Sequence, residues 1–193
     1  YKKYSKEEID LIDKSIEDYK QYGEHIYINE GVGNIGVQEI RERVERHIKI
    51  KKSIPVVLID YIQILAAADI NRSLTDKQKT DENVLELKRL SRDFSIPIIG
   101  ISSFNRNNYT EPVNLTSFKE SGAIEYSSDV LIGLQYDKMD YITVTKKRQN
   151  GDTYEALEND QERGLRIKTI MDNATELAKT GQAVDIQVKI LKN

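Results

Sequence analysis

The chain has 193 residues, of which 38% are hydrophobic and 32% charged, and its formal net charge is -3 at pH 7. This length predicts one domain with a sizeable core. The negative net charge argues against a protein that coats nucleic acid generally. Any contact with nucleic acid would therefore need a local patch or an assembled ring. The sequence has no cysteine, which excludes disulfides and thiolate metal sites. No apolar run reaches membrane-span length and the N-terminus is charged, so we expect a cytoplasmic protein without membrane contact.

The first 51 residues predict two helices separated by a short strand. A capping box at Ser5 predicts an amphipathic helix over about 5–21. Residues 25–29 are typical of a strand, and residues 37–51 predict the second helix. The order helix, strand, helix is compatible with an α/β fold.

A glycine-rich stretch joins this strand to the second helix. Gly31, Gly33 and Gly36 form a literal G-x-G-x-x-G, and Asp60 follows at about the distance where a dinucleotide fold places its ribose-binding acid. The glycines begin past the end of the predicted strand instead of at its tip. A Rossmann-type dinucleotide-binding domain that uses these glycines is therefore an alternative interpretation.

The most informative stretch is an apolar run that ends in a carboxylate. Residues 56–59 are mostly β-branched and run straight into Asp60. A run of this kind predicts a central strand of a parallel sheet that helices cover on both faces. The carboxyl end of such a strand is where open α/β sheets bind ligands. Asp60 either holds Mg²⁺ beside a nucleotide's phosphates, directly or through water, or caps the next turn.

Helix and strand continue to alternate after this carboxylate. A threonine N-cap, Thr75 or Thr80, begins a helix. Residues 96–101 predict another buried strand, and Ser102 and Ser103 follow it. Right-handed crossovers then predict an α/β fold with a parallel sheet and helices on both faces.

The remaining third of the chain is less regular. A basic cluster, Lys146, Lys147 and Arg148, precedes the turn signal Asn150-Gly151. This cluster is either a solvated strand end or an additional contact to nucleic acid. The other expected elements are a short capped helix at 117–125, strands at 128–135 and 141–145, a helix at about 154–179 and a last strand at 184–191.

Three blocks of the sequence resemble one protein family. Residues 57–63, Val-Leu-Ile-Asp-Tyr-Ile-Gln, resemble the Walker-B segment "VIDYLQ" of DnaB-type replicative helicases, whose motor domain has a RecA-like fold. Residues 98–106 resemble that family's sensor segment "VVALSQLNR". Residues 119–125, Lys-Glu-Ser-Gly-Ala-Ile-Glu, are similar to its "RESGAIE". The order and spacing also match, and residues 5–30 are similar to the family's helix and "LYIDD" strand.

The resemblance implies an architecture and an activity. It implies an α/β, RecA-like P-loop NTPase fold, in which helices flank a mostly parallel twisted sheet truncated at its N-terminus. The chain would be one partial motor domain, 1–193, with an insertion at about 137–180. The complete protein would couple ATP hydrolysis to translocation on single-stranded DNA as a hexameric ring, with a primase or helicase loader as a further partner.

The resemblance also implies roles for single residues. Asp60 would be the catalytic Walker-B carboxylate and would bind Mg²⁺–ATP, with the metal held through water. Gln63 and Ser103 would lie at the nucleotide. Lys192 matches the lysine of the family's "KQR" and would reach the phosphates of the neighbouring subunit. A loop that follows the DNA backbone would supply the DNA-binding residues Lys119, Glu120 and Gly122, with Arg106 in addition.

The sequence departs from the family at three points. Ser103 replaces the sensor glutamine and is too short to reach a γ-phosphate without water. The arginine of "KQR" would follow Asn193. No G-x-x-x-x-G-K-[ST] occurs in the 193 residues, so we expect the P-loop and the strand with the catalytic glutamate to lie before Tyr1, and the chain alone to hydrolyse no ATP. The third interpretation is a helicase-like interaction module without catalysis.

Overall fold

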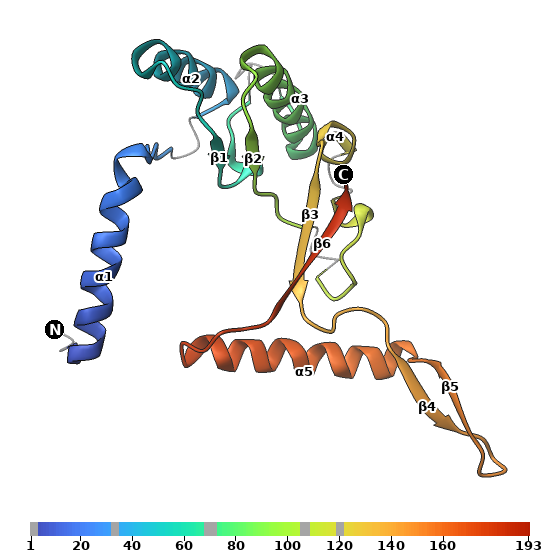
Figure 1. The fold of residues 1–193 in the computed structure, drawn as a ribbon. Helices are drawn as coiled ribbons and strands as arrows, with labels where there is room; N and C mark the ends of the chain where they lie inside the picture. The colour runs from blue at the N-terminus through green and yellow to red at the C-terminus, as the bar shows by residue number, and fades with distance from the viewer. Residues whose placement is uncertain (1–3, 32–34, 68–72, 105–108, 119–121) are drawn as a thin grey trace. The chain divides into compact units, whose positions relative to one another are not determined.

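The computed structural model describes most of the chain, and Figure 1 labels its elements. The chain divides into two compact units, Tyr1–Val32 and Gly33–Asn193. The described residues are 4–31, 35–67, 73–104, 109–118 and 122–193.

The first unit contains helix α1, Lys6–Tyr22. Its predicted capping box is confirmed, since the backbone N–H of Glu8 donates to Ser5 Oγ at 3.2 Å and the N–H of Ser5 donates to Glu8 Oε2 at 2.7 Å. The strand predicted at 25–29 is wrong. A 3-10 helix takes Gly23–His25, and residues 26–31 have no regular structure. A strand needs a neighbour to satisfy its backbone groups, and within this unit none is described.

The second unit begins with the alternating elements that the sequence predicts. Helix α2, Val37–Lys51, precedes strand β1, Val57–Ile59. A 3-10 helix, Ile62–Ile64, follows β1. Helix α3, Asp76–Phe94, has Thr75 as its N-cap and leads to strand β2, Ile98–Gly100. β1 and β2 pair in parallel, as the β–α–β order predicts.

Within the second unit, the core covers one face of this sheet. Ile59 is buried, whereas Leu58 is 65% exposed and Ile99 is 55% exposed. Successive side chains of a strand point to opposite faces, so one face of the β1–β2 pair packs on the core and the other does not.

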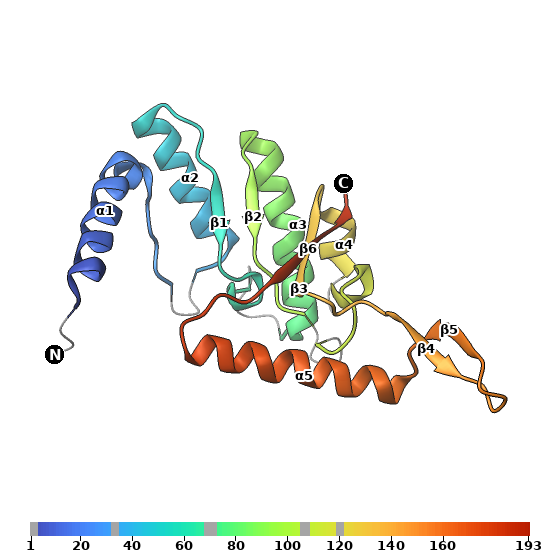
Figure 2. The same ribbon diagram turned by 60° about the horizontal axis from the view of Figure 1, so that its bottom comes forward.

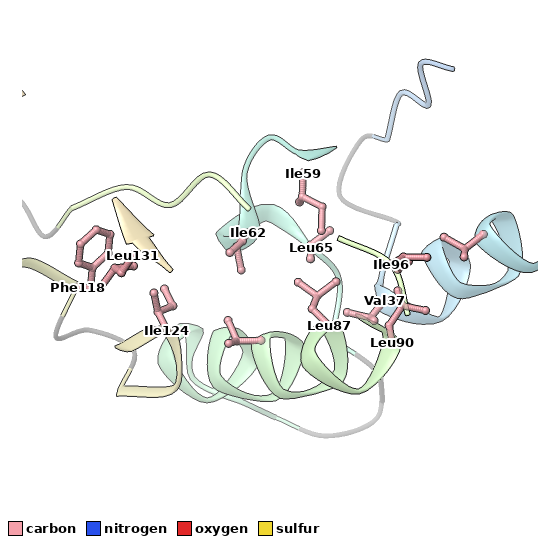
Figure 3. Packing of buried hydrophobic residues seen from close by; sticks show 12 residues of the cluster. Val37, Ile59, Ile62, Leu65, Leu87, Leu90, Ile96, Phe118, Ile124 and Leu131 are labelled. Atoms are coloured by element: carbon pink, nitrogen blue, oxygen red, sulfur yellow. The ribbon is translucent and has the colours of Figure 1, made fainter. Parts of the chain in front are cut away.

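The core of this unit joins both strands to α2 and α3. Figure 3 shows these buried side chains, and Leu90 of α3 is fully buried among them. The apolar area removed from water here is the main favourable term for the fold. The cluster consists of Val37, Val44, Ile59, Ile62, Leu65, Val84, Leu87, Leu90, Ile96, Phe118, Ile124 and Leu131.

A short helix and an antiparallel strand pair extend this core. Helix α4, Gly122–Ser127, packs on α3 and leads to strand β3, Leu131–Tyr136. Strand β6, Ile186–Lys192, pairs antiparallel with β3 (Figure 2). The register places Leu131 opposite Lys192.

Residues between β3 and β6 form a hairpin and a long helix. Strands β4, Thr143–Lys147, and β5, Thr153–Leu157, pair antiparallel around the predicted turn, where Gly151 has φ 95°. Helix α5, Asp160–Lys179, follows. The helix predicted from residue 154 is therefore wrong for its first residues, which form β5.

Candidate functional site

The carboxyl ends of β1 and β2 meet at one edge of their sheet. Backbone hydrogen bonds continue past the ends of the two strands. Ile101 N donates to Ile59 O at 2.9 Å, and Ile62 N donates to Ile101 O at 2.9 Å. Gly100 leaves room for the Ile62 side chain here, since a Cβ on residue 100 would lie 2.6 Å from Ile62 Cδ1. The polar residues that follow both strands are thereby brought to the same edge, as parallel pairing predicts.

Three of the predicted nucleotide residues lie at this edge. Asp60 follows β1 and is exposed to solvent, and the peptide bond that follows it is cis. Gln63 reaches across to the segment after β2, where its Nε2 donates to Ser102 Oγ at 2.8 Å and lies 3.5 Å from Ser103 O. Sequence reasoning missed Ser102, although its place beside Ser103 at a strand end was a signal for it.

The edge offers oxygen atoms but no preformed metal cage. Among the described residues, no three His, Cys, Asp or Glu side chains cluster. Gln63 Oε1 is buried and has no hydrogen-bond partner there, so it can accept from water or a ligand. One carboxylate with ordered water is a common way for proteins to hold Mg²⁺ beside phosphates. The donor set around Asp60 therefore fits a water-mediated magnesium site.

Lys192 lies elsewhere, against α4. Its Nζ donates to the backbone carbonyls of Glu125 at 2.9 Å and Tyr126 at 3.2 Å. The neighbouring Asp129 has its pKa held below the ordinary value, first by a hydrogen bond and the charge of Lys88 and to a smaller degree by the charge of Lys192. The predicted reach of Lys192 to a neighbouring subunit stays a prediction.

The predicted DNA-binding residues are only partly described. Gly122 is the first residue of α4 and is half-buried. Among the described residues, a Cβ at this position would contact Tyr126, at 3.9 Å. The other three predictions, Arg106, Lys119 and Glu120, lie outside the described residues.

The glycine-rich stretch does not form a dinucleotide site in the residues described. Gly33 lies outside them, and no regular strand precedes Gly31. Gly36 is the N-cap of α2, and its backbone N–H donates to Glu39 Oε2 at 2.9 Å. The carboxylate of Glu39 thus occupies the helix N-terminus where a pyrophosphate would bind.

A network of ion pairs in residues 110–166 was not predicted. The Glu158 side chain is 1% exposed and accepts from Arg166 Nε at 2.8 Å. Arg163 donates to Thr110 O at 2.7 Å and pairs with Glu111 at 3.2 Å. Arg163 thereby attaches α5 to the loop that follows β2, and Arg166 attaches it to Glu158, directly after β5. The partners of Arg163 lie more than fifty positions away in the sequence, so no local sequence signal connects them.

A cavity of about 550 Å³ lies beside Arg163. Its walls combine the apolar Ile167 and Met171 with the acidic Asp160 and Asp172. The mixture of charges defines no single ligand class.

The basic cluster forms the end of β4 and the start of the hairpin turn. Lys146 pairs with Glu162 of α5 at 3.0 Å. The guanidinium of Arg148 lies 5.3 Å from the ring centre of Tyr154 across the hairpin. Lys147 is exposed. The cluster is thus partly engaged in contacts within the chain.

Comparison with known proteins assigns the family. The family model for the DnaB-like helicase C terminal domain matches residues 2–180. The chain belongs to this family. The DnaB-like domain has the α/β, RecA-like fold that the sequence predicts, and the match favours neither the Rossmann domain nor a non-catalytic module.

The curated proteins that the chain resembles include replicative DNA helicases. A probable replicative DNA helicase of Trieres chinensis is 29% identical over 108 residues, 54% of this chain and 24% of that protein. The replicative DNA helicase DnaC of Bacillus subtilis (strain 168) is 29% identical over 128 residues, 65% of this chain and 27% of that protein. The chain therefore spans about a quarter of the length of these relatives.

One solved structure is similar over part of the chain. It is described as a DnaB-like replicative helicase and its interactions with primase. Its TM-score is 0.47, with 21% identity over 64% of this chain and 33% of that one.

Within the described residues, no helix has the length and apolarity to cross a membrane.

Proposed function

We propose that this DnaB-like chain is part of an ATP-driven motor that moves along single-stranded DNA, with Asp60 at its Mg²⁺–ATP site. The observation that carries the proposal is the shared edge of β1 and β2, where Asp60 and the Gln63–Ser102 pair lie together. Family membership over residues 2–180 supports it.

At the nucleotide, Asp60 would hold Mg²⁺ through water and thereby help to neutralise the phosphate oxygens. Ser103 is exposed and would reach a γ-phosphate through a water molecule. The hydrogen bond from Gln63 fixes Ser102, and so limits where the adjacent Ser103 can point. When bound, Mg²⁺ would supply charge neutralisation, and these side chains would position it.

At the DNA, Lys119, Glu120, Gly122 and Arg106 would follow the phosphate backbone without reading the bases. A cation and backbone amides suffice for such contacts, because phosphates repeat along every strand.

The complete protein would act as a hexameric ring, with a primase or a helicase loader as a partner. Lys192 would contribute at the junction between subunits. A ring also reconciles the net charge of -3 with DNA binding, because assembly can concentrate local basic groups around one channel.

The metal site is tested with Mn²⁺ as a paramagnetic stand-in for Mg²⁺. With ATP present, we expect Mn²⁺ to broaden the amide signals of Tyr61, Ile62 and Ser102 in nuclear magnetic resonance spectra. Asp60→Asn should abolish the broadening, and Asp137→Asn, which removes an exposed carboxylate elsewhere, should retain it. Broadening that survives Asp60→Asn would refute the assignment.

The DNA contact is tested by fluorescence anisotropy with a labelled oligo-dT over a range of salt concentrations. Each phosphate contact contributes about 0.7 to the slope of log K against log salt on single strands. Lys119→Met should therefore lower the slope by about 0.7, because it removes one contact. Lys77→Met, an exposed lysine of α3, should leave it unchanged. Equal slopes in all three proteins would contradict the DNA-binding role of Lys119.

A further inference from the structure

Helix α4 is held at both ends by side chains from other elements. At its start, the backbone N–H of Ala123 donates to Asp81 Oδ1 of α3 at 3.3 Å. At its end, Lys192 Nζ of β6 donates to the carbonyls of Glu125 and Tyr126. Both views of the fold place the end of β6 beside α4 (Figures 1 and 2).

The position of Lys192 follows from strand pairing. β3 begins shortly after α4 ends, and the register sets Leu131 of β3 opposite Lys192. The antiparallel pairing thus returns the end of β6 to the start of β3, where the last carbonyls of α4 lie. A cation at this place satisfies carbonyls that have no partner within the helix and complements the helix dipole.

A helix of this length depends on such contacts. α4 has six residues, and isolated helices much shorter than 12 residues are unstable in water because nucleation is costly. Ile124 anchors it in the core and is 5% exposed. This one buried side chain prevents the helix from sliding but does not prevent it from rotating about Ile124. Contacts at the two ends of the helix have to prevent that rotation.

We propose that Lys192 is a positioning residue for Gly122: by holding the last carbonyls of α4, it fixes where the first residue of that helix presents its backbone to DNA. The inference rests on the proposed function, because that function gives Gly122 its role. It assigns Lys192 a contact within its own chain, which differs from the predicted contact to a neighbouring subunit.

The first test measures hydrogen exchange at the amides of residues 123–128. Lys192→Met keeps the aliphatic stem but removes the ammonium, so these amides should exchange roughly tenfold faster, the factor that corresponds to about 1.4 kcal/mol. Lys192→Arg should retain most of the protection, because a guanidinium also donates to carbonyls. Unchanged exchange in Lys192→Met would overturn the proposal.

The matched control is Lys189→Met. Lys189 lies on the same strand, carries the same charge, and pairs with Asp140 instead of α4. Exchange at residues 123–128 should therefore stay at the wild-type rate. Acceleration equal to that of Lys192→Met would show a general effect of weakening β6 and would count against the assignment.

The second test separates positioning from direct phosphate contact. Lys192→Met should weaken binding of oligo-dT about fivefold at constant salt. Its slope of log K against log salt should equal that of Lys189→Met, because both substitutions remove one positive charge. A slope lower by about 0.7 than that of Lys189→Met would mean that Lys192 itself contacts a DNA phosphate, and this would refute the positioning role.

The two arms distinguish this inference from the proposed function. If the wild-type chain shows no salt-dependent binding of oligo-dT, the DNA-binding function fails. If the chain binds but the exchange rates of α4 do not respond to Lys192→Met, the positioning role fails alone.

Discussion

Replacing Arg166 with methionine should destabilise the protein by leaving a charge buried. The guanidinium bonds both carboxylate oxygens of Glu158, and it also donates to the backbone carbonyls of Lys138 and Asp140. The Glu158 side chain is 1% exposed and the Arg166 side chain is 20% exposed. The pKa of Glu158 lies below its ordinary value, chiefly because of the hydrogen bond from Arg166.

The expected loss follows from this burial. Removing one partner of a buried ion pair costs about 3–5 kcal/mol, because the other charge stays unpaired. Since Arg166 retains some contact with water, we expect the lower end, about 3 kcal/mol at pH 7. For a chain of this size, the loss lowers the midpoint of thermal unfolding by roughly 6–12 °C. Circular dichroism at 222 nm, a helix-sensitive wavelength, measures it.

Two further measurements isolate the cause. Glu158→Gln in the Arg166→Met background should restore about 2 kcal/mol, because it removes the unpaired charge. Lys179→Met, which breaks the exposed pair with Glu176 on the same helix, should cost less than about 0.5 kcal/mol.

The pH dependence gives the sign of the effect. A lowered pKa means that the pair stabilises the wild-type protein above the ordinary glutamate pKa, about 4.3, and that this stability is lost as pH falls through the lower folded value. In Arg166→Met the carboxyl protonates more readily, so the difference from wild type should shrink between pH 7 and pH 4. A difference independent of pH, or a double variant as unstable as the single one, would refute the reasoning.

Three other outcomes are expected. Leu90→Ala should cost about 3–4 kcal/mol in chemical denaturation, because a fully buried side chain leaves a cavity; a loss below 1 kcal/mol would contradict the core assignment. Gly133→Ala should cost about 1–3 kcal/mol by overpacking, since its Cβ would lie 2.7 Å from Val113 Cγ2, whereas Gly164→Ala, in an open part of α5, should stabilise by about 0.5–1 kcal/mol. The purified chain should release no phosphate from ATP above background; release that Asp60→Ala abolishes would contradict this expectation.

Sequence reasoning succeeded where the determining contacts are local. The cap at Ser5 was predictable, and Thr75 was one of the two expected caps of α3, because a side chain three residues from its partner closes each capping box. Thr80, the other expected cap, lies inside α3. It failed at 25–29, because whether an apolar stretch becomes a strand depends on a neighbour distant in sequence. It also failed at 154–157, the first residues of the helix expected at 154–179, which form β5 opposite β4.

The candidate nucleotide site was predictable only in outline. Parallel strands bring their carboxyl ends together, so Asp60 and Ser103 were expected at one edge. The hydrogen bond from Gln63 to Ser102 depends on the 3-10 helix after β1, which orients Gln63 toward the other strand. No periodicity in the sequence specifies that turn. The contact of Lys192 with α4 likewise depends on the β3–β6 register.

Helix α3 connects the two parts of the candidate site. Asn83 of α3 is 1% exposed and its side-chain amide donates to Leu65 O at 3.4 Å, directly after the segment that carries Gln63. Two positions earlier on the same helix, Asp81 accepts from Ala123 at the start of α4. The segment after β1 and the helix that begins at Gly122 therefore share one support, α3. A packed helix resists bending over so short a distance. A displacement of residues 62–65 and a displacement of α4 would therefore both strain the same turn of α3. The Lys192 contact at the far end of α4 is what keeps that helix from turning independently of this support.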